Sequence, residues 1–141
     1  NVSVVESHFL DVHAGLRIKT SIHRGAYVAN VTYVDIRLER NQVAMQFNDF
    51  YGAANPSCPW PPPHPLPPPI VSNITVARVF GTEIGQATDF EGLHDSPITG
   101  LTLIDVHLYS NKTLPALFNC SNVVGIADNV FPKPCKQITN I

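Results

Sequence analysis

Hydrophobic and polar residues follow one nine-residue pattern four times along the chain. The four segments begin at Asn1, Asn30, Asn73 and Gly100 and align without gaps. Their second, fourth, seventh and ninth positions are aliphatic or aromatic in fourteen of sixteen cases, and their third position is always Ser or Thr. Alternation with period two indicates a strand, and the change of phase between the fourth and seventh positions indicates a bend between two short strands.

The spacing of these segments predicts a solenoid. Consecutive segments start 29, 43 and 27 residues apart, and the longest spacing becomes 29 without the 14 residues from Pro56 to Pro69. A second strand-like run follows each segment; these runs are 16–19, 45–47, 88–90 and 115–118. Such repeats predict an all-β, right-handed parallel β-helix, whose stacked coils lie about 4.8 Å apart and share one apolar column. The alternative is an antiparallel β-sandwich, but the Asn-Gly and Asp-Gly hairpin signals typical of it are missing from the sequence.

Prolines and terminal irregularity mark the segments that leave this pattern. Residues 54–69 hold a Pro-rich tract, with nine prolines between Pro56 and Pro69, and we expect a stiff, extended excursion there. The tract could instead be a ligand for an SH3- or WW-type groove, and Trp60 could either stack on sugars or pin the loop to the coil. Beyond Asn122 the regularity fades, so we expect a C-terminal cap over about 119–141.

The length of the chain and the position at which the pattern starts indicate how much of a domain the sequence contains. With 141 residues and 44% hydrophobic composition, the chain can fill one core, so we expect residues 1–141 to form a single domain. The first coil already starts at Asn1, which would leave its apolar residues at an uncovered end. We therefore expect only the C-terminal coils of a longer β-helix, with earlier residues or another chain packed before Asn1. The missing Met at position 1 agrees with a chain that is processed or truncated at its start.

Charge and hydropathy argue against two classes of partner. Only 14% of the residues are charged, the net charge is −2, and the six His add no basic run, which argues against a nucleic-acid partner. No apolar stretch approaches the roughly 18 residues of a membrane-spanning helix.

Sequons and cysteines indicate a secreted glycoprotein. Asn-x-Ser/Thr sequons, the acceptor sites for N-glycosylation, occur at Asn1, Asn30, Asn73, Asn111 and Asn119. Cys120 and Cys135 could close a short C-terminal loop, with a gain of roughly 3 kcal/mol from the reduced entropy of the unfolded chain. Cys58 would then be free or paired outside this chain.

One strand-like stretch carries candidate chemistry. In Gly15–Thr20, apolar Leu16 and Ile18 alternate with cationic Arg17 and Lys19. Two cations roughly 7 Å apart on one exposed strand face suit an anionic ligand, because Arg can bind a carboxylate through two hydrogen bonds and Lys supplies a mobile charge. An ordinary solvated strand face is the alternative for this stretch taken alone.

The same stretch resembles a known family. Phe9-Leu10, His13, Gly15–Thr20, Arg24-Gly25, Tyr27-Val28, Asn30–Thr32 and Tyr51-Gly52 are similar to plant-type polygalacturonases of glycoside hydrolase family 28. So are Val79–Thr82 and the tail from Asn119 to Cys135. The resemblance implies a right-handed parallel β-helix that acts on pectin in the cell wall or apoplast.

The resemblance also implies roles for particular residues. It assigns Arg17 and Lys19 to the galacturonate carboxylate next to the cleaved bond, and it makes Tyr51 a candidate for an aromatic near the sugar. His13 could hydrogen-bond a sugar hydroxyl or assist a catalytic acid, although a structural His at a turn is the simpler interpretation. The other five His show no metal-ligand spacing, so we expect neither a metal site nor a cofactor.

The family's catalytic motifs are absent from this sequence. Family members carry Asn-Thr-Asp, Asp-Asp and Gly-His-Gly motifs earlier in their chains, and none of the three occurs here. We therefore expect the C-terminal, substrate-binding part of a pectin-hydrolysing enzyme, inactive by itself and with no catalytic residue of its own. The alternative is a non-catalytic glycoprotein that uses the same scaffold for carbohydrate binding or for a structural role.

Overall fold

The structure is a computed structural model that describes residues 1–22, 24–51 and 66–141. In these ranges the chain forms strands connected by turns and contains no helix, and so none that could cross a membrane. The strands are β1 (Val2–Leu10), β2 (Ala14–Lys19), β3 (Tyr27–Glu39), β4 (Val43–Asn48), β5 (Ile70–Ile84), β6 (Gln86–Glu91), β7 (Ile98–Ser110), β8 (Leu117–Ser121), β9 (Val123–Phe131) and β10 (Ile138–Asn140).

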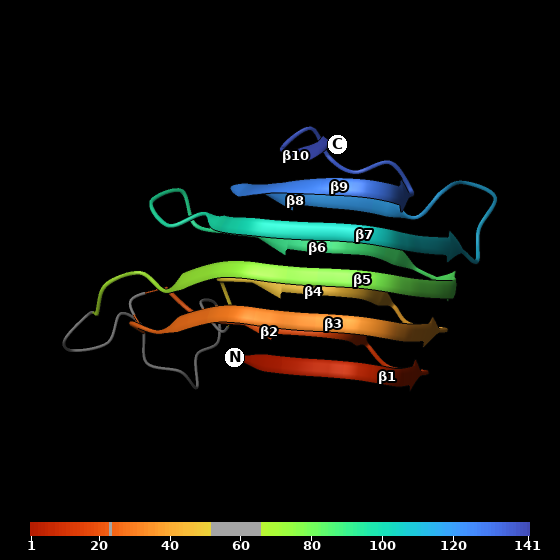
Figure 1. The fold of residues 1–141 in the computed structure, drawn as a ribbon, viewed down its shortest axis with the longest axis horizontal. Helices are drawn as coiled ribbons and strands as arrows, with labels where there is room; N and C mark the ends of the chain where they lie inside the picture. The colour runs from red at the N-terminus through yellow and green to blue at the C-terminus, as the bar shows by residue number, and fades with distance from the viewer. Residues whose placement is uncertain (23, 52–65) are drawn as a thin grey trace.

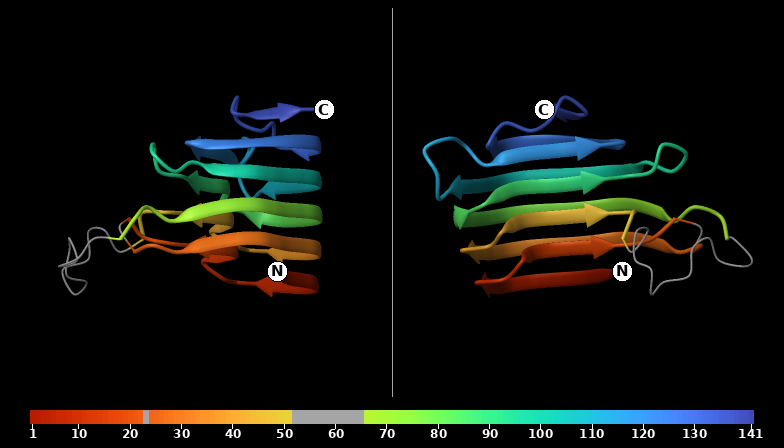
Figure 2. Two further views of the ribbon diagram at one scale, coloured as in Figure 1. Left: turned by 60° about the vertical axis from the view of Figure 1, so that its left-hand side comes forward. Right: turned by 180° about the vertical axis from the view of Figure 1, so that it is seen from behind.

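The strands form two parallel sheets that lie back to back. One has the order β1-β3-β5-β7-β9-β10 and the other the order β2-β4-β6-β8. The chain runs along one sheet, turns, and returns along the other, so each turn of the coil adds one rung to both sheets (Figures 1 and 2). The views from front and back show the coil rising with a right-handed sense. This architecture confirms the right-handed parallel β-helix and excludes the antiparallel sandwich.

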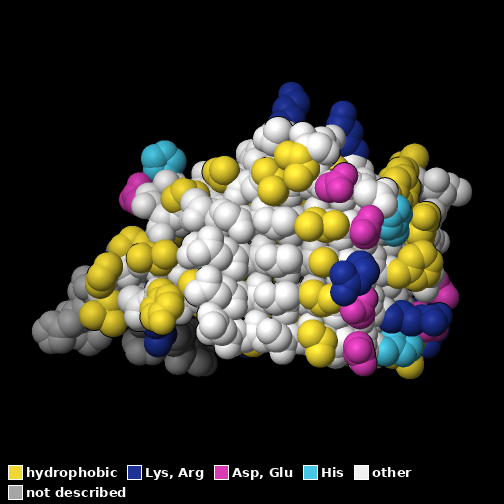
Figure 3. Space-filling model, viewed as in Figure 1, with side chains coloured by type: hydrophobic (Ala, Val, Ile, Leu, Met, Phe, Trp, Pro, Cys, Tyr) yellow, Lys and Arg dark blue, Asp and Glu magenta, His cyan; other side chains and the backbone are white. Residues whose placement is uncertain are grey.

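Strand register confirms the gapless alignment of the four segments. Val2 pairs with Val31, Val31 with Ile74, and Ile74 with Leu101, as the sequence pattern predicts. The hydroxyl residues of the third position stack in the same way on successive rungs. In Figure 3 the middle of this sheet's outer face is uncharged, and the charged side chains gather toward the right-hand ends of the strands.

The predicted bend is a left-handed backbone conformation at the sixth position of each segment. The φ angles there are 47° at Glu6, 58° at Asp35, 53° at Arg78 and 52° at Asp105. Each residue redirects the strand and shifts its phase, which explains why apolar positions four and seven both face inward. Asp tolerates this conformation better than Arg or Glu. Arg78 donates hydrogen bonds of 2.6 and 2.8 Å to Asp35 on the rung below, which ties successive bends together.

The core is a continuous apolar column between the two sheets. Leu16, Met45, Phe47 and Phe90 are almost completely buried. The rings of Phe47 and Phe90 stack with centroids 4.8 Å apart, close to the rung spacing. Burial of each such side chain contributes about 1.5–3 kcal/mol, so a rung is stable only when neighbours cover it.

The C-terminal part differs in detail from the sequence expectation. The fourth short strand begins at Leu117 instead of Pro115, because proline has no N–H to donate to a ladder. Within the expected cap, 119–141, β9 adds a further rung on β7 and β10 pairs with β9. A disulfide joins Cys120 in β8 to Cys135. Cys58, Trp60 and most of the Pro-rich excursion 54–69 lie outside the described residues.

The opposite end of the coil has a free sheet edge. In the described ranges β1 pairs only with β3, and β2 only with β4. Val2 and Val5 are 57% and 54% exposed on β1. The backbone groups of this first rung are therefore available to a further parallel strand.

Candidate functional site

The candidate site begins on β2, where the predicted alternation is confirmed. Leu16 is 1% and Ile18 7% exposed, and both point into the core. Arg17 and Lys19 are exposed on the outer face of the four-stranded sheet. The buried side chains of Leu16 and Ile18 anchor the strand, so that Arg17 and Lys19 project from its outer face.

Tyr51 completes the site from the next rung. Its ring centroid lies 4.1 Å from Lys19 Nζ and 5.5 Å from Arg17 Cζ. The backbone N–H of Tyr51 donates to the carbonyl of Thr20 at 3.0 Å, which fixes the turn after β4 against the end of β2. The structure therefore brings three sequence-predicted residues, Arg17, Lys19 and Tyr51, into one cluster.

Two cations beside a half-exposed aromatic ring form a surface of defined chemistry. The guanidinium can bind a carboxylate through paired N–H groups, and the ammonium adds a second positive charge. Tyr51, 51% exposed, attracts both cations through its ring face. The arrangement suits a ligand that carries a carboxylate on a ring.

A buried acid that sequence reasoning missed supports this turn. Asp49 is 0% exposed and accepts a 2.7 Å hydrogen bond from Thr20 Oγ1. Its second oxygen is buried and has no hydrogen-bond partner among residues 1–22, 24–51 and 66–141. Burial raises the pKa of the Asp49 carboxyl above its usual range, although the Thr20 hydrogen bond acts in the opposite direction. The 29-residue offset between Thr20 and Asp49 equals the repeat spacing and is the signal that could have found this pair.

His13 lies apart from the three-residue cluster. It sits just before β2, four residues from Arg17, which corresponds to about 13 Å along an extended chain. Its Nδ1 is 2.8 Å from Gln42 Oε1, and it lines an open cavity of about 620 Å³ together with Arg40 and Asn41. The structure does not bring His13 to the cations of β2.

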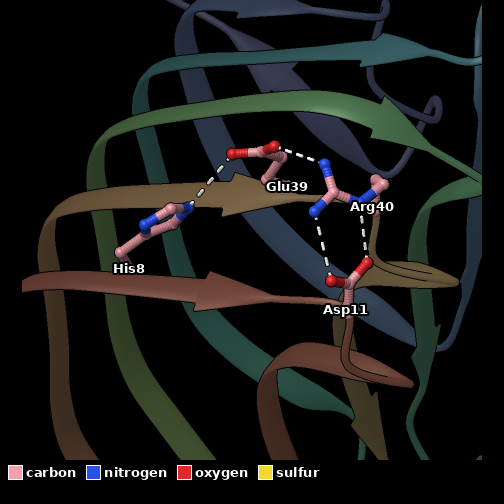
Figure 4. A network of polar contacts seen from close by, with 4 residues as sticks. All are labelled: His8, Asp11, Glu39 and Arg40. Atoms are coloured by element: carbon pink, nitrogen blue, oxygen red, sulfur yellow. Dashed lines mark hydrogen bonds and ion pairs between the residues drawn. The ribbon is translucent and has the colours of Figure 1, made fainter.

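An ion-pair network holds the turn that leads to His13. Arg40 donates to both oxygens of Asp11, at 2.7 and 3.1 Å, and also contacts Glu39 (Figure 4). His8 lies 3.4 Å from Glu39 on its other side. The hydrogen bonds from Arg40 hold the pKa of Asp11 below its usual value. The network therefore joins the turn after β1 to the turn after β3 on the next rung.

Polar residues continue from Arg17 and Lys19 onto the next rungs in two columns. The first column is Arg17, Gln46, Asp89 and Asn119, and the second is Lys19, Asn48, Glu91 and Ser121. Gln46 Nε2 donates to Asp89 Oδ2 at 3.0 Å, and Asn48 Nδ2 donates to Glu91 Oε2 at 2.6 Å. The outer face therefore changes from cationic to amide to acidic within three rungs.

Three of the sequon asparagines lie on strands of the two sheets, whereas Asn1 precedes β1 and Asn111 follows β7. Asn30 and Asn73 occupy left-handed bends on neighbouring rungs, with Asn73 Nδ2 3.5 Å from Asn30 Oδ1, and both are exposed. Asn1 and Asn111 are also exposed, whereas Asn119 is half-buried and donates to Asp89 Oδ1 at 3.4 Å. Glycosylation at these positions stays a prediction.

Comparisons with known proteins give a consistent result. The model of Glycosyl hydrolases family 28 matches residues 1–130. A "Probable polygalacturonase" of Vitis vinifera is 25% identical over 132 residues, which cover 92% of this chain and 26% of that protein. The chain thus spans about a quarter of the length of that curated relative. No solved structure matches.

Proposed function

The chain belongs to Glycosyl hydrolases family 28, and from this premise we propose that it supplies the substrate-binding coils of a pectin-degrading, polygalacturonase-like enzyme. The Vitis vinifera relative, described as a probable polygalacturonase, supports galacturonan as the substrate. Pectin is a cell-wall polymer, so the proposed location is extracellular, in the cell wall or apoplast.

The observation that carries this proposal is the cluster of Arg17, Lys19 and Tyr51. Two cations on one rung and an aromatic ring from the next fit a galacturonate unit, with its carboxylate on the cations and its ring beside Tyr51. His13 lies before the start of β2, away from the cations, and forms a hydrogen bond with Gln42. In this proposal its role is structural.

The hydrolytic step needs groups that we propose to lie on coils before Asn1. An inverting glycosidase uses an acid and a base about 6.5–9.5 Å apart on opposite sides of the scissile bond. Asp89 and Glu91 leave one strand in the same direction, so both would lie on the same side of a bound sugar. Preceding coils would stack on the free edge of β1, where a parallel rung continues the ladder. The chain by itself is then inactive.

A non-catalytic carbohydrate-binding glycoprotein is the second candidate. The observations that favour it are the cationic cluster, which can bind an acidic polysaccharide without catalytic groups, and the five sequons. Such a protein would bind acidic polysaccharide and leave it intact.

The deciding experiment uses the full-length protein from the gene that encodes this chain. The enzyme proposal expects acidic pairs and a Gly-His-Gly motif upstream, release of reducing ends from polygalacturonate, and inversion at the anomeric carbon by NMR. If the upstream region lacks these motifs and no reducing ends appear while polygalacturonate still binds, the non-catalytic function is correct.

A further inference from the structure

The outer face of the four-stranded sheet becomes acidic two rungs beyond the cations. Asp89 stands in the column of Arg17, and Glu91 in the column of Lys19, each separated from its cation by one amide residue. With rungs about 4.8 Å apart, the two carboxylates lie roughly 10 Å from the two cations along the coil axis. Both side chains are only half-buried, so their charges face the solution.

The residues between the two charged rungs hold the carboxylates in place. The amide groups of Gln46 and Asn48 donate to Asp89 and Glu91, at 3.0 and 2.6 Å. Asn119, on the rung beyond, lies 3.4 Å from the other oxygen of Asp89. These hydrogen bonds hold the two carboxylates at fixed positions on the outer face, and each amide already directs one N–H toward a carboxylate.

The shape of the face sets the path of a polymer. Strands β2, β4, β6 and β8 are only five or six residues long, so the face is a narrow strip that runs along the coil axis. A pyranose ring is about as long as the rung spacing of roughly 4.8 Å. A galacturonan chain with one carboxylate on Arg17 and Lys19, extended toward β8, therefore brings the unit two places further on over Asp89 and Glu91.

We propose that Asp89 and Glu91 are specificity-determining residues that exclude a free galacturonate unit two places beyond the unit bound at Arg17 and Lys19. This inference rests on the proposed function, because it assumes that the cations bind a galacturonate carboxylate. The preferred substrate is then one of two kinds. Either the galacturonan chain ends before the position over Asp89 and Glu91, or the sugar at that position is neutral, such as a methyl-esterified galacturonate.

Binding of defined ligands to the 141-residue chain tests this inference. The ligands are galacturonate monomer, tetragalacturonate with free carboxylates, and the same tetramer fully methyl-esterified except at one end. The variant Asp89→Asn/Glu91→Gln keeps acceptors for Gln46 and Asn48 and removes both charges. The matched control, Glu6→Gln/Asp128→Asn, removes two exposed acids from the other sheet. Circular dichroism checks that every variant keeps its β structure.

The inference expects the Asp89→Asn/Glu91→Gln variant to bind the acidic tetramer about five- to tenfold more tightly than the parent at about 0.01 M ionic strength. The gain should fall below about twofold in 0.5 M salt, where the charges are screened. Binding of the monomer and of the esterified tetramer should gain less, because their single carboxylate stays roughly 10 Å from the two changed residues. The control variant should show no selective gain.

The outcomes separate the two proposals. If Arg17→Ala/Lys19→Ala abolishes binding but Asp89→Asn/Glu91→Gln gives no selective gain for the acidic tetramer, this inference is wrong and the carboxylate site stands. If Arg17→Ala/Lys19→Ala leaves all binding unchanged, the carboxylate site is wrong, and the specificity inference is wrong with it.

Discussion

Asp49 is a buried residue directly after β4, two residues before Tyr51 of the candidate site. It is completely buried, and among the described residues the hydroxyl of Thr20 is the one group that donates to its side chain. Removing a carboxylate from water without full hydrogen bonding disfavours its charged form, which is why the pKa of Asp49 is raised. The charged carboxylate therefore lowers the free energy of unfolding at neutral pH. Its hydrogen bond to Thr20 joins the ends of β2 and β4.

This raised pKa gives a prediction for pH dependence. Because the folded-state pKa lies above the unfolded value, the folded state binds the proton more tightly, and stability rises as pH falls through the folded pKa. Relative to an Asp49→Asn variant, the parent chain should gain stability when the pH is lowered from 7 toward 4. Urea unfolding of both proteins across this range measures the difference. A difference that stays constant or changes in the opposite direction contradicts the assignment.

Tyr51 gives a second prediction at the residue scale. Its ring orders Arg17 and Lys19, and such contacts are worth about 0.5–1 kcal/mol at exposed sites. Tyr51→Ala should weaken binding of galacturonate about two- to fivefold, whereas Tyr51→Phe, which keeps the ring, should bind almost like the parent. Isothermal titration calorimetry measures both. Equal loss in the two variants would show that the hydroxyl, not the ring, is needed.

At the scale of elements, one rung stabilises the next through stacked side chains. Phe47 is buried between Tyr33 and Phe90, with ring centroids at 6.2 and 4.8 Å. Phe47→Ala should cost about 3–5 kcal/mol, because it removes buried surface and leaves a cavity between rungs. Phe80→Ala, which truncates a ring that is 48% exposed on the outer face, should cost much less. Chemical denaturation measures both, and similar losses would contradict the stacked core.

The pairing of the long strands was predictable from the sequence, because each of these strands repeats the same pattern of apolar and hydroxyl residues. Once the third-position hydroxyls and the apolar positions align at Asn1, Asn30, Asn73 and Gly100, the parallel register of β1, β3, β5 and β7 follows. The start of β8 was not predictable from the same pattern. Thr88 pairs with Phe118 after a local register shift, and such an irregularity leaves no periodic signal.

The site was only partly predictable, for a related reason. Arg17 and Lys19 are neighbours on one strand, so alternation alone predicts them as a pair. Tyr51 meets them from another rung through a turn, and Asp89 accepts its hydrogen bond from Gln46, 43 residues earlier. Contacts of this kind depend on the stacking of coils and on side-chain conformation, neither of which a single segment encodes.

At the scale of the whole molecule, the candidate site lies at the first rung, next to the free edge of the β-helix. In the part of the chain that the structure describes, β2 pairs with β4 on one side, and Tyr51 reaches it from the second rung. In a solenoid each rung is stabilised by its neighbours, so a rung stacked on β1 and β2 would order the cations further. The location agrees with the proposal that the catalytic groups come from coils stacked on this edge.

The most direct test of the central claim is the affinity of oligogalacturonate for the parent chain and for Arg17→Ala/Lys19→Ala, measured at several salt concentrations. The variant Arg37→Ala/Lys136→Ala, which removes two exposed cations elsewhere, is the matched control. We predict at least a tenfold loss for Arg17→Ala/Lys19→Ala at low salt, together with a weaker salt dependence, and little change in the control. Unchanged, salt-insensitive affinity in Arg17→Ala/Lys19→Ala would contradict the account.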